Sequence, residues 1–131
     1  MSKETLNPLA NAQAQVKKAC DALGTDPAVY ELLKEPQRMI EISIPVKMDN
    51  GSIKVFKGYR SAHNDAVGPY KGGIRFHQNV NADEVKALSI WMSIKCQVTG
   101  IPYGGGKGGI TVDPSELSQN ELEQLSRGWV R

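Results

Sequence analysis

Three lysines in unusual surroundings are the residues of this sequence best suited to do chemistry. Lys107 is the one charged residue in the glycine run Gly104–Gly109, within the stretch IPYGGGKGGITVDP. Lys71 lies between an aromatic residue and two glycines in GPYKGGIRF, and Lys95 precedes the glycine run by a few residues. A lysine amine can pair with a carboxylate or transfer a proton. Three converging amines would suit a small substrate with two carboxylates and a reacting carbon.

The glycine run does not fit the common phosphate-binding patterns. Gly104, Gly106 and Gly109 satisfy G-x-G-x-x-G, but that fingerprint requires a strand before it and a helix after it. Here an expected helix precedes the run and a β-branched segment follows. A Walker-type loop fails because Ile101 and Gly108 stand where it needs glycine and Ser or Thr. Two interpretations stay open: a flexible linker, or a loop that lets the backbone approach a substrate closely.

Lys95 has an ambiguous position on the helix expected to run to about Val98. At about 100° per residue, its neighbours on the helix surface are apolar: Leu88, Trp91 and Met92. Lys95 is therefore expected to project from the apolar face. Such a lysine either extends its amine to solvent along the apolar surface or points into a pocket. Because the helix ends just before the glycine run, we expect Lys95 to lie near Lys107.

Helix start and stop signals divide the chain into segments. Gly24 is a typical residue after a helix end, and Asp26-Pro27 is a typical helix start. Ser or Asn followed three residues later by Glu, as at Asn81 and Ser118, predicts a capping box. These signals predict helices near 8–23, 27–33 and 82–98 and from 119 onward.

Alternating hydrophobicity and turn residues predict the strands. Apolar residues alternate with mostly polar ones at Ile40, Ile42, Ile44 and Val46, which predicts a half-buried strand. Pro45 inside this strand indicates an edge position or a bulge. Asp49-Asn50-Gly51 predicts a hairpin turn into the partner strand SIKVFKGYR. HNDAVGPYKGG is expected to be a loop, and GGIRF and GITV to be strands. The predicted fold class is α/β, a mixed sheet flanked by helices.

Composition narrows the functional classes. The 131 residues suit one domain, and a net charge of +2 argues against nucleic-acid or membrane partners. The polar N-terminus lacks the apolar core of a signal peptide. Cys20 and Cys96 form no disulfide framework, and His63 and His77 show no metal-ligand spacing. We expect a cytoplasmic protein with no metal site.

The lysine motifs resemble those of the glutamate, leucine, phenylalanine and valine dehydrogenase family, and in particular its glutamate dehydrogenases. IPYGGGKGGITVDP is similar over its full length to the family's active-site signature, and GPYKGGIRFH is similar to its upstream glycine-lysine motif. The steps of 24 residues from Lys71 to Lys95 and 12 residues to Lys107 also match. The similarity covers nearly all of residues 27–131.

The resemblance implies a role for each lysine. Lys107 corresponds to the catalytic lysine, Lys95 to the lysine that binds the substrate α-carboxylate, and Lys71 to the lysine that binds the distal γ-carboxylate. Met92 resembles a substrate-pocket residue of some family members, whereas others carry glutamine there. The implied reaction converts L-glutamate, water and NAD(P)⁺ to 2-oxoglutarate, ammonium and NAD(P)H.

The resemblance also implies a domain organisation. Residues 1–131 correspond to the N-terminal substrate-binding and oligomerisation domain of amino-acid dehydrogenases, and we expect this domain to be truncated at its C-terminal end, inside a helix. The nucleotide-binding Rossmann domain, which would bind NAD or NADP, is absent from this chain, so no cofactor-binding residue is assigned. A homohexamer is expected, inactive without the cofactor domain. The alternative is a freestanding oligomerisation or small-anion-binding module without catalysis.

Overall fold

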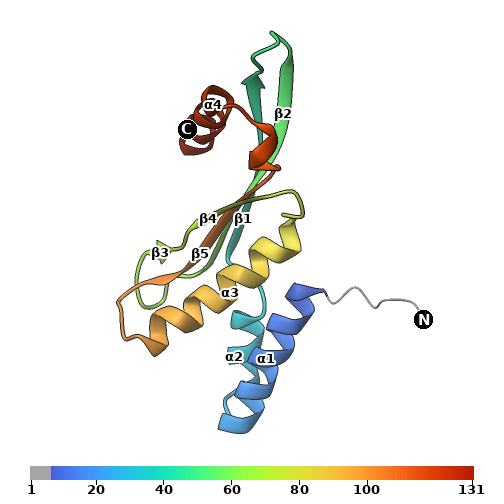
Figure 1. The fold of residues 1–131 in the computed structure, drawn as a ribbon. Coiled ribbons are helices and arrows are strands. Elements are labelled where there is room, and N and C mark those ends of the chain that lie inside the picture. The colour runs from blue at the N-terminus through green and yellow to red at the C-terminus, as the bar shows by residue number, and fades with distance from the viewer. Residues whose placement is uncertain (1–6) are drawn as a thin grey trace, which may run out of the picture.

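A mixed five-stranded sheet organises residues 7–131, the residues that the computed structural model describes (Figure 1). The strands are β1 (Arg38–Lys47), β2 (Ile53–Asn64), β3 (Tyr70–Lys71), β4 (Ile74–His77) and β5 (Gly104–Thr111). Their order in the sheet is β1-β2-β5-β3, and β4 also pairs with β5. β2 is antiparallel to both β1 and β5, whereas β3 and β4 run parallel to β5. The predicted mixed α/β fold is confirmed.

Helices cover both faces of the sheet (Figure 1). They are α1 (Pro8–Leu23), α2 (Pro27–Leu33), α3 (Ala82–Val98) and α4 (Gln119–Val130), with a short 3-10 turn η1 (Pro114–Glu116). Gly109 of β5 faces Val85 of α3, whereas the neighbouring Gly108 faces Trp129 of α4. α3 and α4 therefore lie on opposite faces, because successive residues of a strand point to opposite sides.

Two hydrophobic clusters hold these layers together. One cluster lies between the sheet and α4 and includes Ile44, Phe56, Ile110 and Leu125. The other joins α1 to α3; its buried members are Leu9, Ala12, Val16, Ala87 and Ile90. α3 is thus packed on two sides, against the sheet and against α1. Within residues 7–131 no helix combines the length and apolarity needed to cross a membrane.

The predicted hairpin and edge strand are confirmed. β1 and β2 pair in antiparallel register with Ile44 opposite Phe56, and Gly51 occupies the turn with φ 87°. Pro45 lies in β1, which within residues 7–131 pairs on one side only, as expected for a proline without a backbone donor. The predicted alternation of buried and exposed residues is confirmed at Ile44 and Val46, which are buried. At the start of the strand it is not, because Ile40 is 46% exposed.

The expectation that the glycine run is a loop before a strand was wrong. The run itself begins β5 at Gly104, and β5 is a central strand with neighbours on both edges. The expected loop HNDAVGPYKGG is also shorter than predicted, because His63 and Asn64 end β2 while Tyr70 and Lys71 form β3. Glycine is depleted in strands because it offers no side chain to pack. Here the neighbouring backbones come too close for a side chain.

The predicted helix termini are confirmed. Gly24 follows α1 with φ 60°, and Asp26 accepts a hydrogen bond from the Ala28 N–H at the start of α2. Ser118 forms a complete capping box with Glu121 at the start of α4. The Asn81 side chain also caps α3.

The capping box expected at the start of α3 is only half formed. Asn81 Oδ1 accepts a hydrogen bond from the Glu84 N–H at 2.9 Å. The Glu84 carboxylate, however, pairs with Arg75 of β4. A tertiary ion pair therefore takes the place of the second local bond.

Candidate functional site

The three elements that carry the lysines meet at Gly105. Lys71 of β3 pairs with Gly105 in the parallel register, and the Gly105 N–H donates a 3.0 Å hydrogen bond to Ser93 Oγ of α3. Lys95 follows Ser93 by two residues on α3, and Lys107 follows Gly105 by two residues on β5. Three segments far apart in the sequence thus bring their lysines to one region of the fold.

The Lys107 side chain lies on the α3 face of β5. Gly105 and Gly109, two residues before and after it, both face α3, and strand geometry places Lys107 on the same side. Its Nζ lies 3.8 Å from the position that a Cβ atom on Gly73 would occupy, in the turn between β3 and β4. Lys107 as a whole is half-buried. The Lys107 amine therefore lies beside the turn that joins β3 to β4, next to β5.

Lys95 does not lie on the buried face of α3, and its exposure agrees with the interpretation in which the amine extends to solvent along a partly apolar surface. The buried residues of α3 are Val85, Ala87, Ser89, Ile90, Ser93 and Cys96. At about 100° per residue, Lys95 lies about 200° around the helix from Ser93 and about 140° from Ile90. Its side chain is exposed, and Met92, one turn earlier, is half-buried. The helical wheel identified its neighbours correctly, but these are not the core side of the helix.

The flank of α3 that carries Lys95 is turned toward β3 and β4. Ile94 and Gln97 line a cavity together with His63 and Asn64 of β2, so their flank faces β2. Met92 and Lys95 lie on the opposite flank of the helix. Lys71, on β3, is exposed on this side of the molecule.

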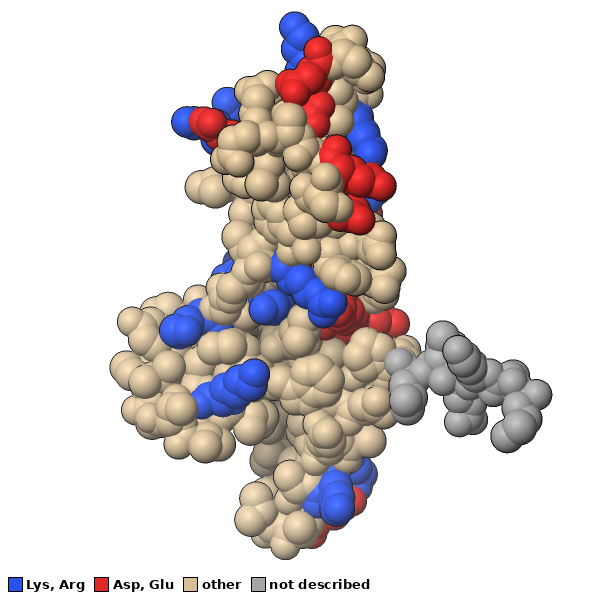
Figure 2. All heavy atoms as spheres, in the orientation of Figure 1, with Lys and Arg blue, Asp and Glu red and all other residues tan. Residues whose placement is uncertain are grey.

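The three lysines carry uncompensated positive charge. Ion pairs among residues 7–131 engage other basic residues, among them Lys57 with Glu41 and Lys86 with Glu35, but none of these three. Figure 2 shows basic side chains without acidic ones over the part of the molecule formed by β3 and the C-terminal half of α3. Such a surface favours a small anion with more than one carboxylate.

Glycine is required here by the close approach of backbones. A Cβ atom on Gly105 would lie 2.3 Å from the Ser93 backbone nitrogen, and one on Gly72 would lie 1.4 Å from the Gly106 carbonyl oxygen. Gly104, Gly105 and Gly106 are buried. The flexible-linker interpretation is therefore wrong. The missing side chains allow β3 and α3, which carry Lys71 and Lys95, to pack closely against β5.

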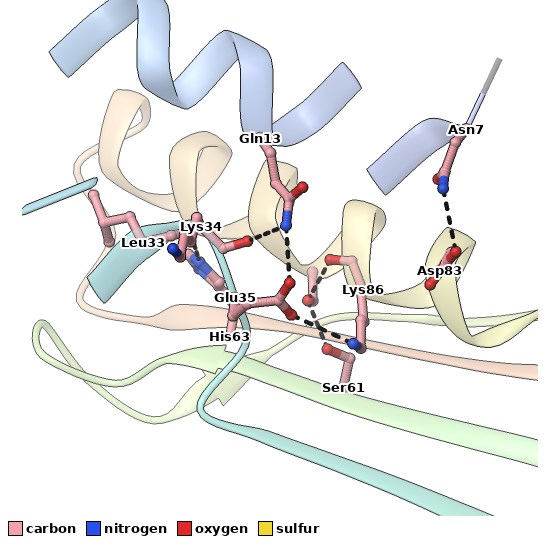
Figure 3. Close-up of polar contacts among 10 residues, drawn as sticks. Asn7, Gln13, Leu33, Lys34, Glu35, Ser61, His63, Asp83 and Lys86 are labelled. Carbon is pink, nitrogen blue, oxygen red and sulfur yellow. Dashed lines mark hydrogen bonds and ion pairs between the residues drawn. The ribbon is translucent and has the colours of Figure 1, made fainter. Parts of the chain in front are cut away.

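Sequence reasoning missed a buried polar network beside the lysines. His63 is 1% exposed; its Nδ1 lies 2.6 Å from Ser93 Oγ, and its Nε2 lies 2.8 Å from the Leu33 carbonyl oxygen. Figure 3 shows His63 beside Leu33. Burial lowers the pKa of His63 from its ordinary value near 6.5, against a weaker raising effect of the bond to Leu33. Partners 30 residues apart leave no local pattern in the sequence.

The glycine run of β5 does not fit a nucleotide cofactor. Gly104, Gly106 and Gly109 lie inside a strand, not between a strand and a helix N-terminus, where a pyrophosphate would bind. Neither do residues 7–131 bring three or more His, Cys, Asp or Glu side chains together as for a metal ion.

Comparison with known proteins gives the family. The model of the Glu/Leu/Phe/Val dehydrogenase dimerisation domain matches residues 36–131. The chain belongs to this family. It is 75% identical over 130 residues to the NAD-specific glutamate dehydrogenase of Clostridioides difficile. The aligned region covers 99% of this chain and 31% of that protein.

Solved structures of family members share the fold. Glutamate dehydrogenase from Peptoniphilus asaccharolyticus superimposes with a TM-score of 0.94 at 75% identity, covering 96% of this chain and 32% of that one. The hetero-hexameric glutamate dehydrogenase from Thermus thermophilus, in its Leu-bound form, gives a TM-score of 0.89 at 37% identity, covering 98% and 31%. The chain therefore spans about a third of the length of these relatives. The family resemblance inferred from the lysine motifs is confirmed.

Proposed function

We propose that this chain is the substrate-binding and oligomerisation part of an NAD-dependent glutamate dehydrogenase. The enzyme would deaminate L-glutamate oxidatively to 2-oxoglutarate and ammonium. The observation that supports the proposal is that β3, α3 and β5, the elements that carry Lys71, Lys95 and Lys107, meet at Gly105. None of the three lysines has an ion-pair partner among the described residues. Family relatives named as NAD-specific favour NAD over NADP.

The proposed roles follow from the placement of each lysine. Lys107 is half-buried, and its amine lies beside the turn between β3 and β4, a position that would suit a proton transfer. Lys95 and Lys71 lie on exposed positions of different elements and would pair with the α- and γ-carboxylates. Met92, on the same flank as Lys95, would contact the aliphatic part of the substrate.

NAD would supply the acceptor for the hydride. Because the glycines of β5 do not fit the cofactor, we place its binding site outside the described residues and assign no cofactor-binding residue here. What this chain's residues do is bind the two carboxylates and move a proton at Lys107.

The test uses a fusion of residues 1–131 to the remaining part of the Peptoniphilus enzyme, hereafter the fusion enzyme. We expect it to reduce NAD in the presence of glutamate and the 131-residue chain alone not to. Lys107→Ala should lower kcat about a hundredfold or more, the scale of a lost acid–base group. Lys18→Ala, at an exposed lysine of α1, is the matched control and should leave kcat unchanged. Near-normal turnover of Lys107→Ala at saturating glutamate would contradict the assignment.

Self-association is part of the same proposal. The matching family model describes a dimerisation domain, and the Thermus relative is a hetero-hexamer. We therefore propose that this chain contributes to a homo-oligomer, with a hexamer as the expected form.

A further inference from the structure

A directed chain of hydrogen bonds links four elements behind the lysine site. It runs from Gly105 of β5 to Ser93 of α3, then to His63 of β2 and finally to the backbone of Leu33 in α2. His63 and Ser93 are both buried, with 1% and 9% of their surfaces exposed. The chain reaches the strand residue that lies opposite Lys71.

Each proton in this chain has one possible position. The Leu33 carbonyl oxygen can only accept, so His63 Nε2 must carry a hydrogen. In the neutral ring Nδ1 is then an acceptor, so the Ser93 hydroxyl donates to it. Ser93 Oγ in turn accepts from the Gly105 N–H. Burial, which lowers the pKa of His63, keeps the ring in this neutral form.

The histidine determines which way the serine hydroxyl points. A serine within a helix can otherwise donate to a carbonyl of the preceding turn, as Ser89 does to Lys86 at 2.7 Å. By accepting the Ser93 hydrogen, His63 leaves the oxygen lone pairs of Ser93 directed at Gly105. The start of β5 is thereby held against α3.

We propose that His63 is a positioning residue for the lysine site and acts through Ser93 and Gly105. The chain of bonds holds β5 against α3 and so sets the spacing between Lys107, Lys71 and Lys95. The consequence for catalysis rests on the proposed function, whereas the hydrogen-bond chain itself does not.

Two substitutions of similar size separate positioning from packing. His63→Asn places an amide oxygen near the Nδ1 position and keeps an acceptor for Ser93. His63→Gln reaches the Nε2 position and keeps a donor for Leu33, but leaves Ser93 without its acceptor. Ser93→Ala removes the central link. His77→Gln is the control, because His77 lies outside the chain and accepts from the Asn79 N–H.

The first measurement is hydrogen exchange at the Gly105 amide in the 131-residue protein, followed by NMR. We expect His63→Gln and Ser93→Ala to speed this exchange at least tenfold relative to Ile110 on the same strand. His63→Asn and His77→Gln should stay within about threefold of the unchanged protein. Unaltered Gly105 exchange in His63→Gln would overturn the proposal.

The second measurement needs no variant. The ¹⁵N shifts of the His63 ring distinguish a protonated from an unprotonated nitrogen, and we expect the hydrogen on Nε2 at neutral pH. A hydrogen on Nδ1 would overturn the proposal even if every variant failed to fold.

Kinetics of the fusion enzyme test the catalytic consequence. His63→Gln should lower kcat/KM for glutamate about ten- to a hundredfold, with a raised KM for glutamate and an unchanged KM for NAD. His63→Asn should recover most of this loss. Combining His63→Gln with Ser93→Ala should be no worse than Ser93→Ala alone, because both break one chain.

The outcomes separate the two proposals. Equal losses in His63→Asn and His63→Gln, with both KM values unchanged, would show that His63 only packs. An inactive fusion enzyme with unchanged sequence would refute the proposed function, while the exchange and NMR measurements would still decide the role of His63.

Discussion

In the proposed enzyme we expect substrate choice to depend on Lys71. It is exposed on β3, opposite Gly105, and has no ion-pair partner within residues 7–131. An exposed pair contributes only about 0–1 kcal/mol, whereas a pair from which bound substrate excludes water contributes more. The effect of removing this amine therefore reports how closely the site surrounds the γ-carboxylate.

We predict that Lys71→Leu in the fusion enzyme shifts specificity away from glutamate. The ratio of kcat/KM for glutamate to that for norvaline should fall at least tenfold. The γ-carboxylate of glutamate loses its charged partner, whereas the apolar side chain of norvaline gains a contact with the introduced leucine. Lys54→Leu, an exposed lysine of β2, is the control. An unchanged ratio would mean that Lys71 does not contact the substrate side chain.

His63 should make folding stability depend on pH. Its pKa in the folded chain is lowered by burial from about 6.5, so between the two values the unfolded chain binds more protons. The contribution of His63 to the free energy of unfolding is therefore complete above about pH 6.5. It is lost as the pH falls toward the pKa of His63 in the folded chain, by up to about 1.4 kcal/mol per pH unit.

The measurement is urea unfolding of the 131-residue chain at about pH 7.5 and about pH 5.5. At the lower value Asp49 and Asp113, whose pKa values are lowered mainly by side-chain hydrogen bonds, remain ionised. We expect the decrease in unfolding free energy to be smaller in His63→Asn and to persist in His77→Gln. An equal decrease in His63→Asn would assign the effect to other groups.

At the scale of elements, β5 is a central strand whose glycines fit because they have no Cβ atom. Gly105 and Gly72 lie where backbone atoms of α3 and β5 leave no room for a Cβ atom. The strand is defined by hydrogen bonds to β2, β3 and β4, not by side-chain propensity. Its position between these strands and α3 brings the lysine-bearing segments together.

We predict that Gly105→Ala lowers the free energy of unfolding by about 3 kcal/mol or more, because the methyl group would overlap the Ser93 and Ser89 backbones. Gly73→Ala is the control in the same region, since its methyl group would meet only Lys107 Nζ, at 3.8 Å. Chemical denaturation measures both. Comparable losses in the two variants would contradict a role for backbone proximity.

At the scale of the whole molecule, β1 leaves one edge of the sheet unpaired within residues 7–131. Exposed apolar residues accompany it in the hairpin: Ile40 at 46%, Ile53 at 63% and Val55 at 57%. An unpaired strand edge with apolar side chains favours pairing with another chain.

We predict that the 131-residue chain self-associates at micromolar concentration. Ile40→Lys should weaken association at least tenfold, because it places a charge beside the β1 edge. Leu32→Lys, at a 69% exposed position of α2, is the control and should leave association unchanged. Analytical ultracentrifugation that finds only monomer for the unchanged chain would refute this prediction.

The sequence by itself determined the features whose signals are local. Gly24, Asp26 and Ser118 marked helix ends, Asn50-Gly51 marked the hairpin, and the spacing of the three lysines indicated the family. Capping and turn formation involve atoms within a few residues of one another. Such features can be predicted from short windows of sequence.

Only the tertiary structure decided that the glycine run is a central strand, that Lys95 lies away from the buried face of α3, and that His63 reaches Gly105 through Ser93. Each depends on contacts between segments far apart in the chain. The side of α3 that carries Leu88, Trp91 and Met92 is only half-buried, because the helix buries other residues against the sheet and α1. Gly105 belongs to a strand because β2, β3 and α3 close around it, and no window of sequence around Gly105 contains those three partners.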